Sequence, residues 1–161
     1  MNINKTYSKK DLIKHITHLR QQDLKIGFTN GCFDLLHKGH LSLLYQSKQK
    51  CDFLIVGLNS DSSVKLLKGN DRPIDNESFR LNKLSEIKDI DALTIFTEKT
   101  PLNIINDLMP NILFKGADYK NKKVIGSDCV IKNGGKVEFI DILDGFSTTN
   151  IIKNSSNKSQ I

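Results

Sequence analysis

Residues 26–40 read IGFTNGCFDLLHKGH: a short apolar run, a loop that contains Gly31, and the start of a helical pattern at Gly39 and His40. A loop that follows a strand and opens a helix presents free backbone N–H groups and the positive end of the helix dipole, and both attract anions. Gly39 lets a phosphate approach the backbone closely. His37 and His40 can each donate a ring N–H to phosphate oxygens without being cationic at rest. The stretch therefore predicts a phosphate-binding loop.

Two other interpretations of the same loop are open. His37 and His40 can be surface histidines that happen to flank a glycine. Cys32, His37 and His40 also form a C-x4-H-x2-H pattern of metal-binding residue types. Neither Cys51 nor Cys129 stands in a nearby pair that would complete a zinc site, so we predict no metal site. Three widely spaced cysteines indicate reduced thiols rather than a disulfide framework.

Outward from this loop, strands and helices alternate along the chain. The pattern predicts strands at 26–29, 53–58, 92–96, 112–115 and 137–140, and helices at 8–22, 40–50, 61–67, 76–88, 101–108, 127–133 and 147–153. Such alternation predicts an α/β fold, with a doubly wound parallel sheet of about five strands and helices on both faces. In such sheets, ligands bind at the carboxyl ends of the strands where the strand order reverses.

The length and composition describe one ordinary globular domain. The chain has 161 residues, of which 38% are hydrophobic and 26% are charged, and this size leaves no room for a second large domain. We expect a helix within residues 1–24 that packs on a domain of residues 25–153, followed by a disordered tail at 154–161.

Composition also limits the partners and the location. Residues 1–10 lack the apolar stretch of a secretory signal, and no apolar run is long enough to span a bilayer. We therefore expect a cytoplasmic protein with no membrane partner. The formal charge of +6 comes from scattered lysines without interleaved aromatic residues, which favours a basic pocket for a polyphosphate over nucleic-acid binding.

The segment 28–40 resembles the signature of the cytidylyltransferase-like nucleotidyltransferase superfamily. Four further blocks follow in the order expected for that superfamily, at residues 56–61, 67–69 with 72–74, 115–119 and 145–149. From about residue 25 to residue 153, the chain is more closely similar to the family of D-glycero-β-D-manno-heptose 1-phosphate adenylyltransferases, the adenylyltransferase domains of ADP-heptose synthases. The resemblance implies a Rossmann-like fold and transfer of AMP from ATP, carried with Mg²⁺, to a sugar 1-phosphate.

The resemblance also implies roles for individual residues. The implied catalytic residues are His37, His40, Lys68 and Arg80. The implied nucleotide-binding residues are Thr29, Asn30, Gly31, Cys32, Phe33, His37, Gly39, His40, Lys115, Gly116, Phe146, Ser147, Thr148 and Thr149. The implied acceptor-binding residues are Asp34, Asn59, Asp61, Lys68, Arg72, Asp118 and Tyr119.

Several of these residues also fit a purely structural role. Arg80 can be a surface arginine that pairs with Glu77 three residues earlier, a pair worth only about 0.3 kcal/mol. Asp34 can cap local backbone N–H groups instead of orienting the acceptor phosphate. Asp61 and Asp118 can be turn residues, because aspartate is favoured in turns. The segment 147–149 would cap the last helix whether or not it also binds phosphate.

The nucleotide and the acceptor are harder to predict. Cytidylyltransferases that act on glycerol 3-phosphate carry an arginine at the position of Ile142 and tend to carry tryptophan at the position of Tyr119. Both differences favour ATP and a heptose 1-phosphate over that cytidylyltransferase activity. A non-catalytic nucleotide-binding module is a second alternative. The resemblance further implies a homodimer, a separate heptose 7-phosphate kinase upstream, and a product used for lipopolysaccharide.

Overall fold

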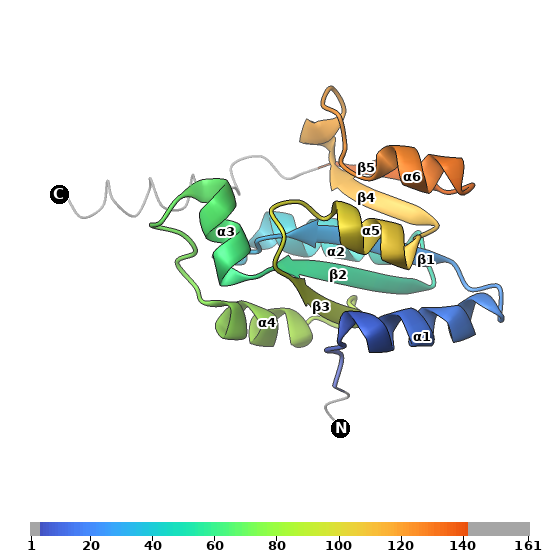
Figure 1. Cartoon of the computed structure of the whole chain (residues 1–161), viewed down its shortest axis with the longest axis horizontal. Coiled ribbons are helices and arrows are strands. Elements are labelled where there is room, and N and C mark those ends of the chain that lie inside the picture. The colour runs from blue at the N-terminus through green and yellow to red at the C-terminus, as the bar shows by residue number, and fades with distance from the viewer. Residues whose placement is uncertain (1–3, 142–161) are drawn as a thin grey trace.

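The computed structural model describes residues 4–141, which form a parallel sheet between two layers of helices (Figure 1). The strands are β1 (Ile26–Gly31), β2 (Phe53–Asn59), β3 (Ala92–Phe96), β4 (Ile112–Gly116) and β5 (Lys136–Ile140), in the order β3-β2-β1-β4-β5. All the strand pairs are parallel. The predicted doubly wound sheet is therefore confirmed, and its strand order reverses at β1, between β2 and β4.

Seven helical segments accompany these strands within the described residues. They are α1 (Lys9–Arg20), α2 (Lys38–Lys48), α3 (Asp61–Lys68), α4 (Glu77–Ser85), α5 (Leu102–Leu108), the 3-10 turn η1 (Ala117–Tyr119) and α6 (Ser127–Lys132). Each predicted helix within residues 4–141 is found, with ends that differ by up to three residues, whereas the one predicted at 147–153 lies outside the described residues. None of these helices is long and apolar enough to cross a membrane.

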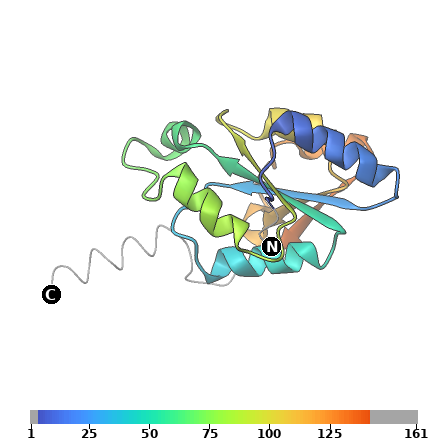
Figure 2. The same cartoon turned by 90° about the horizontal axis from the view of Figure 1, so that it is seen from below.

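The sheet buries side chains on both of its faces. Helices α1, α5 and α6 cover one face, and α2 and α4 cover the other (Figure 2). Ile55 of β2 packs in the first hydrophobic cluster, whereas its neighbours Leu54 and Val56 pack in the second. This division follows from the two-residue period of a strand, which points successive side chains to opposite faces. A strand that is apolar on both faces is the expected signature of a buried parallel sheet.

The N-terminal segment is attached to the sheet edge before α1 begins. Thr6 forms a parallel bridge with Leu93 of β3. The Tyr7 N–H donates to the Leu93 carbonyl at 2.9 Å, and the Leu93 N–H donates to the Lys5 carbonyl at 2.8 Å. Leu12 and Ile16 of α1 are fully buried against the sheet. The edge of β3 is thus covered by this segment, which protects its unpaired backbone groups.

Backbone pairing between β1 and β4 is short. Whereas β1 pairs with β2 from Ile26 to Gly31, its pairing with β4 is confined to Gly27–Ile112 and Phe28–Leu113. Towards the carboxyl ends, side chains connect the two strands instead. The Thr29 hydroxyl donates to the Phe114 carbonyl at 3.2 Å, and the Lys115 ammonium donates to Asn30 at 2.7 Å.

Candidate active site

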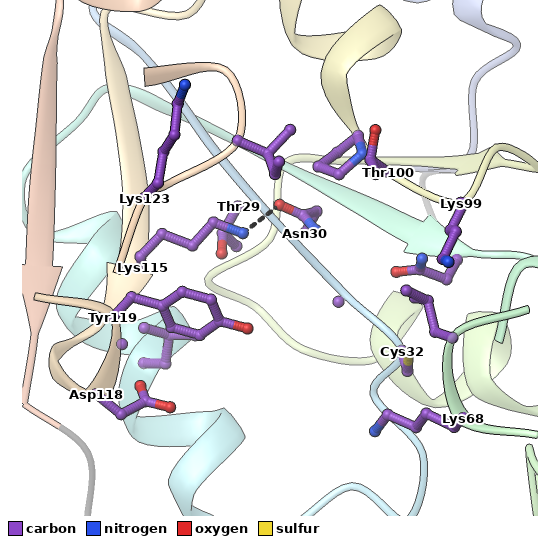
Figure 3. Close-up of a pocket in the computed structure, with 17 residues that line it drawn as sticks. Thr29, Asn30, Cys32, Lys68, Lys99, Thr100, Lys115, Asp118, Tyr119 and Lys123 are labelled. Carbon is purple, nitrogen blue, oxygen red and sulfur yellow. Dashed lines mark hydrogen bonds between the residues drawn. The ribbon is translucent and has the colours of Figure 1, made fainter. Parts of the chain in front are cut away.

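A cavity of about 500 Å³ opens at the carboxyl ends of β1, β2 and β4 (Figure 3). It lies at the strand-order reversal, where doubly wound sheets bind their ligands. Its lining comes from four regions of the chain that are far apart in sequence. The lining residues are Thr29, Asn30, Gly31, Cys32, Leu43, Asn59, Leu67, Lys68, Lys99, Thr100, Pro101, Lys115, Gly116, Asp118, Tyr119, Lys123 and Ile125.

The cavity has two walls of different composition. Lys68, at the end of α3, and Lys99, after β3, lie on one side of it (Figure 3). Lys115 of β4 and Tyr119 of η1 lie on the other side, with the Lys115 ammonium 5.4 Å from the Tyr119 ring centroid. The charged residues in the lining are Lys68, Lys99, Lys115, Lys123 and Asp118. Positive charge thus predominates, which suits a phosphorylated ligand.

The predicted phosphate-binding loop ends in a pair of stacked histidines at the start of α2. His37 is the N-cap residue of α2. The Gly39 N–H donates to His37 Nδ1 at 3.1 Å, and the His37 N–H donates to His40 Nδ1 at 3.2 Å. The two rings lie 3.8 Å apart with an interplanar angle of 22°. Because both Nδ1 atoms accept hydrogen bonds, each neutral ring carries its proton on Nε2, where it can be donated to a ligand.

Both imidazoles are kept neutral by their surroundings. Burial lowers the pKa of His37. Burial lowers the pKa of His40 to about 3, helped by the neighbouring His37 and Lys68 and opposed by Asp34. Neither ring lines the cavity, but His40 stands one turn of α2 before Leu43, which does line it. The expectation that the histidines need not be cationic at rest agrees with these lowered pKa values, and donation to a ligand stays a prediction.

Asp34 fixes the loop that follows α3. Its carboxylate accepts hydrogen bonds from Arg72 Nε at 2.9 Å, from the Ile74 N–H at 2.8 Å and from the Asp75 N–H at 2.9 Å. Burial opposes ionisation of Asp34, but the hydrogen bonds from Asp75, Ile74 and Arg72 together lower the pKa of this carboxyl. The side chain is fully buried and does not line the cavity. The backbone N–H groups that Asp34 binds are therefore distant in sequence and not local, and its contact with an acceptor phosphate stays a prediction.

Arg80 lies under the same loops and not on the surface. Its side chain is completely buried. Nη1 donates to the carbonyls of Cys32 and Asn59, both at 2.7 Å, Nε donates to the carbonyl of Asp75, and Nη2 donates to Asp61 at 2.8 Å. The alternative of a surface arginine paired with Glu77 is therefore wrong, because a local pattern does not show these distant partners. In this structure, Arg80 anchors the loops around the cavity, and its contact with a triphosphate stays a prediction.

The cavity gathers about half of the site residues predicted from sequence. Those that line it are Thr29, Asn30, Gly31, Cys32, Asn59, Lys68, Lys115, Gly116, Asp118 and Tyr119. Those outside its lining are Phe33, Asp34, His37, Gly39, His40, Asp61, Arg72 and Arg80. The predictions at Phe146, Ser147, Thr148 and Thr149 lie outside the described residues, as does the argument from Ile142.

Several lining residues were not predicted. They are Leu43, Leu67, Lys99, Thr100, Pro101, Lys123 and Ile125. Residues 99–101 follow β3 almost directly, so the rule that ligands bind at the carboxyl ends of parallel strands was the signal that could have found them. Within residues 4–141, no three histidine, cysteine, aspartate or glutamate side chains gather as a metal cluster would require. The three cysteines form no disulfide.

The family model described as cytidylyltransferase-like matches residues 28–154, most of the chain. The chain belongs to the cytidylyltransferase-like family. Membership of this family makes the chain a nucleotidyltransferase in the broad sense. The matched region begins in β1 and includes the histidine pair, Lys68 and Lys115.

Curated relatives of this cytidylyltransferase-like chain carry the name bifunctional protein HldE. The protein from Nitrobacter winogradskyi is 53% identical over 91% of the chain, and that from Rhodospirillum rubrum is 49% identical over 92% of it. The chain spans about 30% of the length of these relatives. The family-level prediction made from the sequence is thereby confirmed.

Two solved structures share the fold of this cytidylyltransferase-like chain. A lipopolysaccharide core biosynthesis protein from Thermoplasma volcanium is 28% identical, with a TM-score of 0.59, over 74% of this chain and 97% of that protein. A pantoate-β-alanine ligase from Francisella tularensis, solved with an ATP compound and β-alanine, has a TM-score of 0.64 over 92% of this chain and 72% of that protein. At 18% identity, the second likeness concerns the fold alone.

Replacement of Arg80 by methionine tests its anchoring role. We expect Arg80→Met to lower the free energy of unfolding by about 3–5 kcal/mol, because it leaves Asp61 and three carbonyls without their buried donor. Lys83→Met, at an exposed position on the same helix, should change it by less than about 0.5 kcal/mol. Urea unfolding of both variants measures the difference. Equal stability of the two variants would show that Arg80 is not an anchor.

The protonation of His40 can be followed by NMR. We expect the neutral Nε2–H form to persist to about pH 4, because the pKa of His40 is about 3. Between pH 6.5 and that value, the unfolded chain binds a proton that the folded chain does not, so this residue makes stability fall as the pH falls. A ring ¹⁵N titration measures the midpoint. A midpoint near 6.5, or an Nδ1–H form, would contradict the hydrogen-bond pattern.

Proposed function

We propose that this nucleotidyltransferase transfers AMP from Mg²⁺-bound ATP to D-glycero-β-D-manno-heptose 1-phosphate, giving ADP-heptose and pyrophosphate. The observation that carries the proposal is the neutral, stacked pair of His37 and His40 at the N-terminus of α2, close to a lysine-lined cavity. The identity of 53% with a protein called HldE supports the heptose acceptor. So does the likeness to a lipopolysaccharide core biosynthesis protein.

The proposed reaction is an in-line displacement at phosphorus. An oxygen of the acceptor phosphate attacks the α-phosphorus of ATP, and the bond from that phosphorus to the oxygen that bridges the α- and β-phosphates breaks. Pyrophosphate leaves with Mg²⁺. Such chemistry needs positioning and charge stabilisation more than it needs a protein nucleophile. In the proposal, the Nε2–H groups of His37 and His40 stabilise the charge that develops on the α-phosphate and the bridging oxygen.

The lysines would neutralise the substrates before the reaction. Lys68 reaches the cavity from the end of α3 and also acts on the electrostatics of His40, which is consistent with a contact to the triphosphate. Gly39 and the N-terminus of α2 would supply backbone donors. Asp118 and Tyr119, on the opposite wall, would contact the acceptor, as would Asn59. Arg72 and Asp61, which do not line the cavity, would also contribute to acceptor binding.

The proposal extends to the cellular setting. A homodimer in the cytoplasm, with a separate heptose 7-phosphate kinase upstream, would supply ADP-heptose for lipopolysaccharide. Nucleic acid and membranes are not partners in this scheme. The proposal takes ATP and not CTP as the donor, because Tyr119 and Ile142 stand where glycerol 3-phosphate cytidylyltransferases carry tryptophan and arginine. The competing activity is that of a polyol phosphate cytidylyltransferase.

Pyrophosphate release from pairs of substrates tests this proposal. The purified protein is given ATP or CTP together with heptose 1-phosphate or glycerol 3-phosphate. We expect release with ATP and heptose 1-phosphate, and release at least tenfold slower with the other three pairs. Release with CTP and glycerol 3-phosphate as the preferred pair would make the chain a cytidylyltransferase instead. No release with any pair would favour the non-catalytic module.

Replacement of either histidine tests the mechanism. We expect His37→Ala and His40→Ala each to lower kcat by about 10²-fold or more, because each removes a donor to the charge that develops in the transition state. His18→Ala, at an exposed position on α1, is the matched control and should change kcat by less than twofold. Steady-state kinetics of pyrophosphate release, with circular dichroism to verify folding, measures the effect. A change confined to KM would contradict the proposed role.

A further inference from the structure

Lys115 differs from the other buried cations near the cavity. Only 9% of the residue is exposed, and its ammonium donates to Asn30 Oδ1 at 2.7 Å and lies 5.4 Å from the centroid of the Tyr119 ring. Arg80 is paired with Asp61, and Arg72 with Asp34. None of the ion pairs recorded within residues 4–141 includes Lys115. Its hydrogen-bond partner is a neutral amide.

A buried ammonium that no carboxylate contacts directly is an unfavourable arrangement for the protein alone. Removing a charge from water costs free energy that a neutral acceptor and an aromatic ring recover only in part. The arrangement leaves hydrogen-bond donors available at the cavity. Asn30 accepts one of the three ammonium protons, and Lys115 lines the cavity. The remaining protons can be donated to a ligand that enters there.

We propose that the phosphate group of a bound substrate is the anionic partner of Lys115, and that Asn30 is the positioning residue that holds the ammonium for it. The placement follows from the fold. Backbone pairing of β1 with β4 ends at Phe28–Leu113, so the bond between Asn30 and Lys115 spans the opening between the two strands. This inference rests on the proposed function only in taking the ligand to be a phosphorylated substrate.

The proposal predicts that phosphate binding takes up a proton. Burial lowers the pKa of Lys115 to about 8, against the opposing effect of Asp118. A phosphate beside the ammonium favours its charged form and raises the pKa again. The other titratable or charged groups of the described cavity and its surroundings are Cys32, Lys68, Lys99, Asp118, Tyr119, Lys122 and Lys123. Of these, Asp118 is the one whose charge opposes the lowering of the Lys115 pKa.

A matched pair of variants tests the assignment by calorimetric binding. Lys115→Met removes the buried ammonium, whereas Lys122→Met removes an exposed one that lies 5.3 Å from the same Tyr119 ring and outside the cavity lining. The probes are AMP, adenosine and inorganic phosphate. We expect Lys115→Met to weaken the binding of AMP or of inorganic phosphate by about 10- to 100-fold. The binding of adenosine should weaken by less than twofold. Lys122→Met should leave all three within twofold.

The arms separate the two possible sources of the phosphate. A loss confined to AMP assigns Lys115 to the nucleotide, and a loss confined to inorganic phosphate assigns it to the acceptor. Equal weakening of AMP and adenosine, or no weakening of either phosphate probe, would overturn the proposal. These measurements need no turnover, so they stand apart from the pyrophosphate assay. If the pyrophosphate assay shows that CTP is the donor, CMP and cytidine replace AMP and adenosine as probes.

A second readout uses the unmodified protein and does not depend on the folding of a variant. At pH 8, binding of the phosphate probe should take up about half a proton, because about half of the Lys115 side chains are then neutral. The phosphate of AMP does not contribute, since its second pKa is near 6. Titration in buffers of different ionisation enthalpy measures the uptake. Binding without proton uptake, or uptake that persists in Lys115→Met, would contradict the proposal.

Discussion

The opening between β1 and β4 is the constraint on which the site depends. After β1 the chain passes to α2 on one face of the sheet, and after β4 it passes through η1 to α6 on the other face (Figure 2). Two neighbouring strands whose continuations leave in opposite directions cannot stay paired to their ends, and their backbone pairing stops at Phe28–Leu113. The result is a crevice whose backbone groups and side chains are free to meet a ligand.

Buried charges hold the loops around this crevice. Arg80 binds oxygens from the ends of β1 and β2, from α3 and from the segment before α4, while Asp34 binds three donors of residues 72–75. Each of the two charges has an oppositely charged partner, Asp61 or Arg72. Removing one member of such a pair leaves the other charge buried and unpaired, which costs free energy. The pairs therefore favour this one arrangement of the loops even where their net stabilisation is small. The loops are thereby pre-organised before substrate binds.

The sequence predicts the local features of this architecture and misses those that depend on distant contacts. The strands were found because residues such as 53–58 form continuous apolar runs. The loop before α2 stood out because its glycine and histidines lie between a strand and a helix, and its phosphate binding stays a prediction. Arg80 could not be assigned from its neighbours on α4, since its partners lie in other segments. Lys99 resembles any solvated loop lysine until the end of β3 is placed beside β2. Burial of Lys115 likewise emerges from the packing of β4.

The neutrality of the histidine pair has a consequence for the proposed chemistry. In the proposed reaction, the lysines of the cavity would supply charge for substrates in their ground state, and two imidazolium rings only 3.8 Å apart would repel each other. Neutral Nε2–H donors bind the ground state modestly, but their hydrogen bonds strengthen as negative charge grows on the bridging oxygen. Only interactions that are stronger in the transition state than in the ground state raise the rate of the chemical step. In the proposed reaction, lowered histidine pKa values would favour catalysis, because neutral donors would add little to the binding of the substrate in its ground state.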